Sequence, residues 1–144
     1  MKKMLLLAVV GLVLGAGSAA AELPAEVAAP YLHIQATLAA DSTDGVGEAA
    51  QSIVAAAGDL GDAGAAIVMA ANAVSLADDL VKTRAAFGLL SDAVIKFSDA
   101  AGLGELKVAF CPMARKSWIQ EDGDIANPYH GSEMLRCGSF RPSR

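Results

Sequence analysis

The chain has 144 residues, of which 54% are hydrophobic, and its 11 basic and 16 acidic side chains give a formal net charge of −5. This acidic balance disfavours nucleic acid and anionic lipid surfaces as partners, because both repel a negatively charged protein. No glycine-rich phosphate loop follows a predicted strand, and the hydroxyl, thiol and imidazole groups form no recognisable nucleophile motif. We therefore expect a protein that is not an enzyme and that carries no organic cofactor.

Residues 1–21 have the pattern of a secretory signal peptide. Lys2 and Lys3 precede an apolar run over residues 4–14, and a stretch of small residues follows that ends in three alanines at Ala21. The apolar run is shorter than the roughly 20 residues that a membrane-spanning helix needs. We expect cleavage near Ala21, a periplasmic or secreted location, no membrane attachment after cleavage, and a formal net charge of −7 for the mature chain.

The first part of the mature chain is rich in alanine and poor in aromatic residues, a composition that favours helices. Its first apolar face has spacings of 4, 3 and 4 residues and consists of Val27, Tyr31, Ile34 and Leu38. Pro30 interrupts this pattern. Because proline suits a first helical turn, we expect the stable helix to begin near Pro30 and residues 24–29 to form a separate turn.

Three further helices are predicted along the chain. Residues 41–45, Asp-Ser-Thr-Asp-Gly, are typical of the end of one helix and of the capped start of another. A second helix is therefore expected at about 46–57. Glycines break the pattern before a short helix at 65–77. The strongest periodicity covers residues 80–101, with apolar steps of 3 and 4 residues throughout. We therefore predict a mainly α fold, an antiparallel bundle of three to four helices.

The composition changes at residues 102–104, where two glycines flank a leucine. Beyond them, prolines and glycines are frequent and apolar stretches are short. We expect an irregular segment over residues 105–140 with two or three short strands. The predicted organisation is a helical bundle at 22–104 and a C-terminal cap at 105–144, packed together as one domain.

Four sulfur-containing residues lie in this cap, and they suggest a metal site. Cys111 and Met113 flank a proline that restricts Cys111 to extended conformations, while Met134 and Cys137 are spaced to share one face of a helical turn. Thiolate and thioether groups are soft ligands suited to Cu(I). The imidazole of His130 could add a nitrogen ligand.

Each of these residues also has a simpler interpretation. Cys111 and Cys137 could form a disulfide that closes a loop of about 26 residues and contributes on the order of 3 kcal/mol. The methionines could fill gaps in an apolar cap, and His130 could be a solvated turn residue. The corresponding alternative function is a disulfide-stapled protein-interaction module without metal, in which the turn at residues 127–129 contacts another protein.

The order of several rare residues in the cap resembles a bacterial periplasmic domain family of formally unknown function. Its members occur alone or fused to the adaptor proteins of copper and silver efflux pumps. The chain carries a Phe-Cys-Pro-Met-Ala segment at 110–114, then Trp118, then an Asn-Pro-Tyr-x-Gly-x-x-Met-Leu-x-Cys-Gly segment at 127–138. Weaker helical matches extend the resemblance back to Pro30.

The resemblance implies a periplasmic protein that binds Cu(I) or Ag(I) for metal tolerance or delivery, with Cys111, Met113, Met134 and Cys137 at the sulfur-bearing positions of the family motif. His130 stands where the family more often has an aromatic residue. The hairpin and barrel segments of an efflux adaptor have no counterpart in the chain. We therefore expect a free carrier or accessory protein whose partners are periplasmic metal-efflux or metal-delivery proteins.

Overall fold

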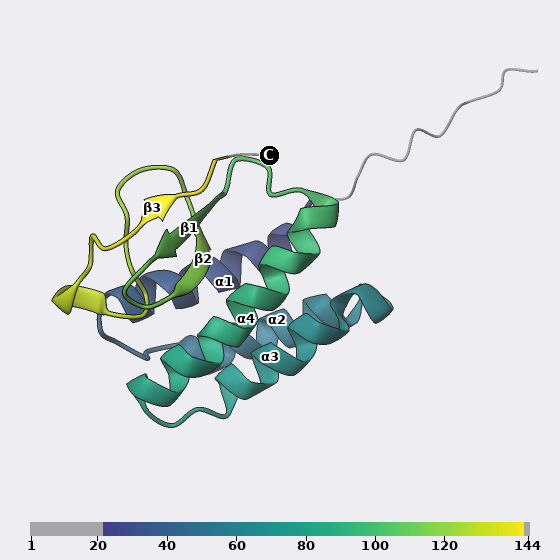
Figure 1. Ribbon diagram of the computed structural model, residues 1–144. Helices are drawn as coiled ribbons and strands as arrows, with labels where there is room; N and C mark the ends of the chain where they lie inside the picture. Colours follow the sequence, from purple (N-terminus) through teal and green to yellow (C-terminus); the bar gives the residue numbers. More distant parts are fainter. Residues whose placement is uncertain (1–21, 143–144) are drawn as a thin grey trace, which may run out of the picture.

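A computed structural model describes residues 22–142; the predicted signal peptide and its cleavage site lie outside the described residues, as do residues 143 and 144. The fold is mainly helical, with four helices packed together and followed by a small three-stranded antiparallel sheet (Figure 1). This arrangement confirms the fold class predicted from the sequence. We refer to residues 105–142 as the C-terminal cap.

The four helices are α1 (Ala25–Ala39), α2 (Val46–Gly58), α3 (Ala65–Ser75) and α4 (Leu80–Ala101). Each packs against the next along the chain, and a short 3₁₀ turn, η1 (Gly61–Gly64), connects α2 to α3. The ends of α2, α3 and α4 agree with the predicted ends within two residues. The side chain of Asp79 caps α4 by accepting a hydrogen bond from the amide of Lys82 at 2.8 Å.

The first helix begins earlier than the sequence pattern predicts. Helix α1 starts at Ala25 and contains Pro30 in its second turn, so the expected separate turn at 24–29 is wrong. Proline removes one amide donor there, but Val27 is fully buried and anchors the first turn in the core. The amide of Leu23 also donates to the carbonyl of Gly102 at 3.0 Å, which ties this end of α1 to the end of α4.

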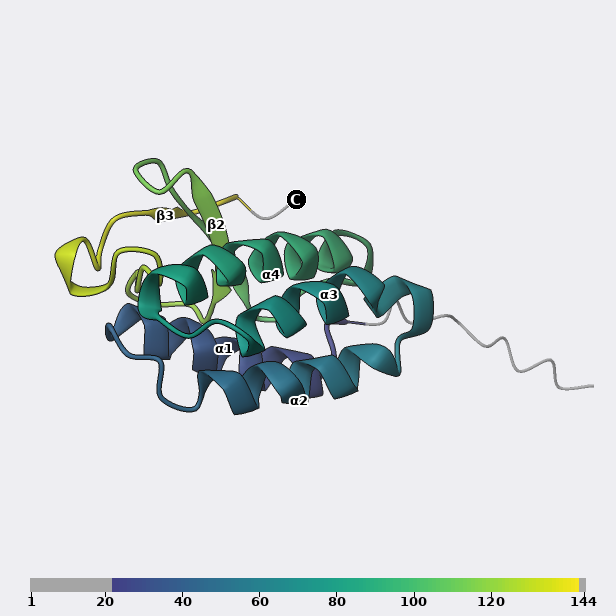
Figure 2. The same cartoon turned by 90° about the horizontal axis from the view of Figure 1, so that it is seen from below.

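The sheet consists of β1 (Lys107–Cys111), β2 (Lys116–Gln120) and β3 (Ser139–Phe140), in the spatial order β2-β1-β3. Both pairings are antiparallel. Strand β2 packs on α4 and α1, whereas α2 and α3 form the opposite side of the molecule (Figure 2). The short strands expected in this segment are therefore present, and a second 3₁₀ turn, η2 (Gly131–Glu133), precedes β3.

One hydrophobic core joins the cap to the bundle. Trp118 and Ile119 of β2 are fully buried in the same cluster as the apolar faces of the helices. The hydroxyl of Tyr31 on α1 lies 2.6 Å from Ser91 Oγ on α4 and accepts a hydrogen bond from the amide of Ile119 at 3.1 Å. Burial raises the pKa of Tyr31 far above its ordinary value, so this hydroxyl stays protonated. The bundle thus provides a fixed platform for the hairpin that carries Cys111.

Candidate functional site

The turn between β1 and β2 positions Cys111. Cys111 is the last residue of β1 and pairs with Lys116 across the hairpin, so residues 112–115 form the connecting turn. Arg115 adopts a positive φ of 55°, which closes this turn. The amide of Ala114 then points back and donates to Cys111 Sγ at 3.4 Å. The sequence Cys-Pro-Met-Ala therefore folds so that the turn backbone surrounds the sulfur atom of Cys111.

Asn127 organises the loop that positions Cys137. Its Oδ1 accepts hydrogen bonds from the amides of Tyr129 at 2.8 Å and His130 at 3.2 Å, which forms a tight local turn. Its Nδ2 donates to the carbonyl of Cys137 at 2.9 Å. Asn127 is fully buried, and its hydrogen bonds are partly shielded from water. One amide side chain thereby holds the start and the end of the loop together.

Gly138 lets the loop approach β1 closely. It has a φ of +139°, a conformation that other residues rarely adopt. A Cβ atom at this position would lie 2.8 Å from Trp118 Cη2 and 3.1 Å from the carbonyl oxygen of Phe110. A larger residue would therefore push the loop, and Cys137 with it, away from β1.

These two elements bring the sulfur atoms of Cys111 and Cys137 together. Both cysteines are unbonded thiols, and they lie near disulfide distance. Cys111 is completely buried and Cys137 is half-buried. We call these two residues the thiol pair.

The surroundings of the thiol pair favour one shared negative charge. Burial raises the pKa of Cys111, but hydrogen bonds from Cys137, from the amides of Ala114 and Met113 and from Asn127 outweigh burial, and the pKa lies below its ordinary value. The hydrogen bond with Cys111 raises the pKa of Cys137, as does burial. A negative charge on the pair is therefore favoured at Cys111 over Cys137.

The other three predicted ligands differ in their burial and in their position relative to the thiol pair. The side chain of Met113 is 67% exposed, although its backbone amide faces both cysteine sulfurs. Met134 is half-buried, and its carbonyl accepts a hydrogen bond from the amide of Cys137 at 2.9 Å. His130 lines a separate pocket together with two cationic side chains, Arg84 and Lys116. A positive neighbourhood disfavours a metal cation, so we do not include His130 in the proposed metal site.

The turn at residues 127–129, for which the alternative function expects a partner contact, is directed mainly into the protein. Asn127 and Pro128 are buried, and the hydroxyl of Tyr129 donates to the carbonyl of Ser117 at 2.6 Å. The ring of Tyr129 lies between Phe87 and Trp118, with a centroid separation of 6.0 Å from each. This turn therefore contributes to the internal packing, and its contact with another protein stays a prediction.

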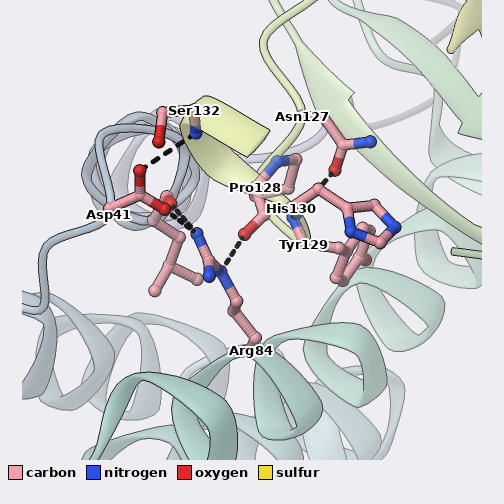
Figure 3. Close-up of polar contacts among 8 residues, drawn as sticks. Asp41, Arg84, Asn127, Pro128, Tyr129, His130 and Ser132 are labelled. Atoms are coloured by element: carbon pink, nitrogen blue, oxygen red, sulfur yellow. Dashed lines mark hydrogen bonds and ion pairs between the residues drawn. The ribbon is translucent and has the colours of Figure 1, made fainter. Parts of the chain in front are cut away.

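Arg84 and Asp41 fix the same loop to the bundle, and sequence reasoning did not identify this role. Arg84 on α4 donates to the carbonyls of Pro128 and Leu38, both at 2.8 Å, and pairs with Asp41 at 2.7 Å (Figure 3). Asp41 also accepts a hydrogen bond from the amide of Ser132 at 3.0 Å. We call Arg84 and Asp41 the arginine clamp. Its residues are 43 positions apart, so no local pattern could have revealed it.

The ionisation of Asp41 reflects these contacts. Hydrogen bonds from Ser132 and then from Arg84 lower the pKa of Asp41 from 3.8 to about 2. The carboxylate is therefore charged at any physiological pH, and the clamp stays intact there. In a molecule with an acidic surplus, this pair fixes the loop without adding net charge.

Within residues 22–142, no three His, Cys, Asp or Glu side chains are grouped so that they could hold a metal ion. None of the described helices combines the length and the hydrophobicity that a membrane span requires. Comparisons of the chain with protein-family models, with curated proteins and with solved structures gave no match.

Proposed function

We propose that the protein is an exported carrier that binds a soft monovalent ion, Cu(I) or Ag(I), through the thiol pair, for metal tolerance or delivery. The observation that supports this proposal is the proximity of two unbonded thiols, one of them buried, at the junction of the hairpin and the loop. The resemblance of the cap to the efflux-associated domain family points in the same direction.

The chemistry of the donor atoms fits such an ion. Soft thiolates select Cu(I) over hard cations, and the thiolate rather than the thiol is the ligand. The hydrogen bonds at Cys111 lower its pKa and so favour its thiolate, whereas the raised pKa of Cys137 makes its proton the harder one to displace on binding. Because protons compete with the ion for sulfur, we expect the affinity to fall as the pH is lowered.

The two methionines have a secondary role in this proposal. Each lies within three residues of a cysteine, so a thioether could approach an ion held by the thiol pair. The exposed side chain of Met113 has no packed position to give up before it does so. Loss of the thioethers should therefore weaken binding much less than loss of either thiolate.

A competition titration tests the proposal. The reduced mature protein is titrated anaerobically with Cu(I) against a chromophoric chelator, as the wild type and as Cys111→Ser, Cys137→Ser and the double variant Met113→Leu with Met134→Leu. We expect each serine variant to lose at least about 100-fold in affinity, on the scale of changes at a metal site, and the double leucine variant to lose less. Met69→Leu, at a methionine that is 75% exposed on α3, is the matched control and should bind as the wild type.

Two outcomes would contradict a site at the thiol pair. The wild-type protein could fail to compete with the chelator, or the serine variants could compete as well as the wild type. Circular dichroism of each variant establishes that a loss of affinity is not a loss of fold.

The same proximity supports a second candidate, a disulfide-stapled interaction module. In this alternative, Cys111 and Cys137 are joined after export, and the bond closes the cap permanently. Intact-mass analysis of periplasmic protein, alkylated before any reduction, separates the two functions. Complete pairing, seen as a mass two hydrogen atoms lower and no alkylation, would favour the staple, because oxidation removes the thiolate ligands.

A further inference from the structure

A pocket of about 320 Å³ lies beside the arginine clamp, where helix α4 meets the cap. Its polar walls come from Arg84, Lys116 and His130, and none of its lining residues is acidic. The remaining walls are the side chains of Val81, Ala85, Ala114 and Tyr129. In a chain with 16 acidic and 11 basic residues, a pocket with three nitrogen-bearing side chains and no carboxylate is a distinct electrostatic feature.

Two of these side chains have polar groups without a counterpart. Nε2 of His130 is buried and has no hydrogen-bond partner among the described residues. A buried polar atom without a partner is costly, and in native structures its partner is commonly a ligand or a water molecule that occupies the site. The backbone amide of His130 meanwhile donates a hydrogen bond to Asn127 Oδ1 at 3.2 Å, which holds the residue at the edge of the pocket.

Lys116 is the second group, and helix α4 holds it in place. A Cβ atom built on Gly88 would lie 2.7 Å from Lys116 Nζ, so the missing side chain of this buried glycine makes room for the lysine. Lys116 Nζ also lies 6.0 Å from the centre of the Tyr129 ring. Within residues 22–142, no carboxylate forms an ion pair with it. Its positive charge is therefore packed against the pocket wall and left without a counter-ion.

We propose that this pocket binds a small organic carboxylate. The ammonium of Lys116 and the Nε2 of His130 would receive the carboxylate, and the alanine, valine and tyrosine walls would contact its apolar part. Arg84 contributes less, because its guanidinium already pairs with Asp41 on the other side (Figure 3). The site is distinct from the thiol pair, so its test is independent of metal binding.

Nuclear magnetic resonance provides the test, because the chain has two histidines. Benzoate is titrated into the reduced protein and the ring signals of His130 are followed, with exposed His33 on α1 as the internal control. We expect a saturable shift at His130 with a Kd of about 1 mM or lower, and none at His33. Neutral benzamide has the same shape without the charge and should produce no saturable shift.

Two variants locate the binding site. Lys116→Gln removes the unpaired charge and should weaken benzoate binding by about tenfold or more. Ala85→Leu, at an exposed position of α4, fills the pocket and should abolish binding, whereas Ala55→Leu, at an exposed position of α2, should leave it unchanged. Circular dichroism establishes that these variants keep the fold.

The proposal is overturned if benzoate gives no saturable shift at His130, or if His33 or benzamide responds equally. It is also overturned if binding survives both Lys116→Gln and Ala85→Leu. Inorganic phosphate that bound as tightly as benzoate would contradict an organic carboxylate as the ligand.

Discussion

The helical bundle and the C-terminal cap are stabilised in different ways. In the bundle, apolar side chains repeat at helical spacing and pack together in one core, so each buried side chain contacts several other apolar side chains. In the cap, single polar side chains bind several backbone groups each: Gln120, for example, accepts from Trp118 Nε1 and the amide of Ala126 and donates to the carbonyl of Asp124. The bundle can therefore tolerate many conservative changes, whereas the cap depends on a few individual residues.

This difference matters for the thiol pair. Cys111 lies on a strand that shares the core of the bundle, but Cys137 lies on a loop that depends on Asn127, Gly138 and the arginine clamp. Cys111 is thus positioned mainly by packing, whereas the loop that carries Cys137 is positioned mainly by hydrogen bonds. Two spectroscopic probes can separate these regions, because far-ultraviolet circular dichroism reports mainly the helices and the only tryptophan, Trp118, reports the cap.

The largest loss of stability is expected for a side chain that packs against both regions. Phe87 is fully buried on α4, with ring centroids 5.1 Å from Tyr31 and 6.0 Å from Tyr129. Phe87→Ala should lower the free energy of unfolding by about 3–5 kcal/mol, and both probes should shift together in urea. Leu89→Ala, at a residue of the same helix that is 59% exposed, is the control and should cost well under half of that. Separate transitions for the two probes would show that the regions unfold independently.

A smaller effect, concentrated in the cap, is expected for Gly131→Ala. Gly131 has a φ of +54°, and an added Cβ atom would collide with the side chains of Asp41 and Arg84. We expect a loss of about 1–3 kcal/mol from backbone strain and a displaced clamp, with the tryptophan signal changing at lower urea than the helical signal. Gly47→Ala in α2, where the added atom meets nothing within 4 Å, should be neutral or stabilising. Equal behaviour of the two alanine variants would contradict the role assigned to the clamp.

Replacement of the clamp arginine by lysine should lower the stability as much as Gly131→Ala does, or less. The planar guanidinium of Arg84 reaches two carbonyls and one carboxylate at once, and its side chain is 17% exposed. A single ammonium cannot reproduce this geometry, so Arg84→Lys should cost about 1–2 kcal/mol, measured by urea unfolding. Lys82→Arg in the same helix, at a lysine whose ion pairs are solvent-exposed, is the control and should change stability by less than about 0.5 kcal/mol. A stability of Arg84→Lys equal to the wild type would mean that the positive charge alone is sufficient.

The smallest effect concerns the pH dependence of stability. The pKa of Asp41 is about 2 in the folded protein and 3.8 as its ordinary value, so its stabilising contribution is present above pH 3.8 and lost as the pH falls toward 2. Asp41→Asn should therefore make the unfolding free energy depend less steeply on pH in this interval. The reduction in slope corresponds to the uptake of up to about one proton on unfolding. An unchanged slope, measured by urea titrations across the interval, would contradict the ion pair. Asp44→Asn, at an exposed aspartate a few residues away, should leave the slope as it is.

The sequence predicted the bundle well because helices depend on nearby residues. The apolar steps through Thr83, Phe87, Leu90 and Val94 are all buried in α4, as the periodicity indicates. The start of α1 was wrong because burial of Val27 outweighs the local preference of Pro30. The general location of the strands also followed from composition, but their order did not, because β3 pairs with β1 across about 30 residues of intervening chain.

The candidate site could be anticipated only in part. The sequence predicted that Cys111 and Cys137 act together, in a disulfide or in a metal site, and the fold places their side chains close to each other. The arginine clamp and the unpartnered Nε2 of His130 depend on contacts between distant segments, which no spacing rule records. Whether the thiol pair carries a metal stays a prediction, which the competition titration is designed to decide.

The short third strand has a consequence for association between copies of the protein. Strand β3 covers only Ser139 and Phe140, and Pro142 follows almost at once, with no backbone N–H to offer. The β3 edge of the sheet is therefore too short to pair with a strand of a neighbouring molecule. This edge therefore protects the folded protein against edge-to-edge association with further copies.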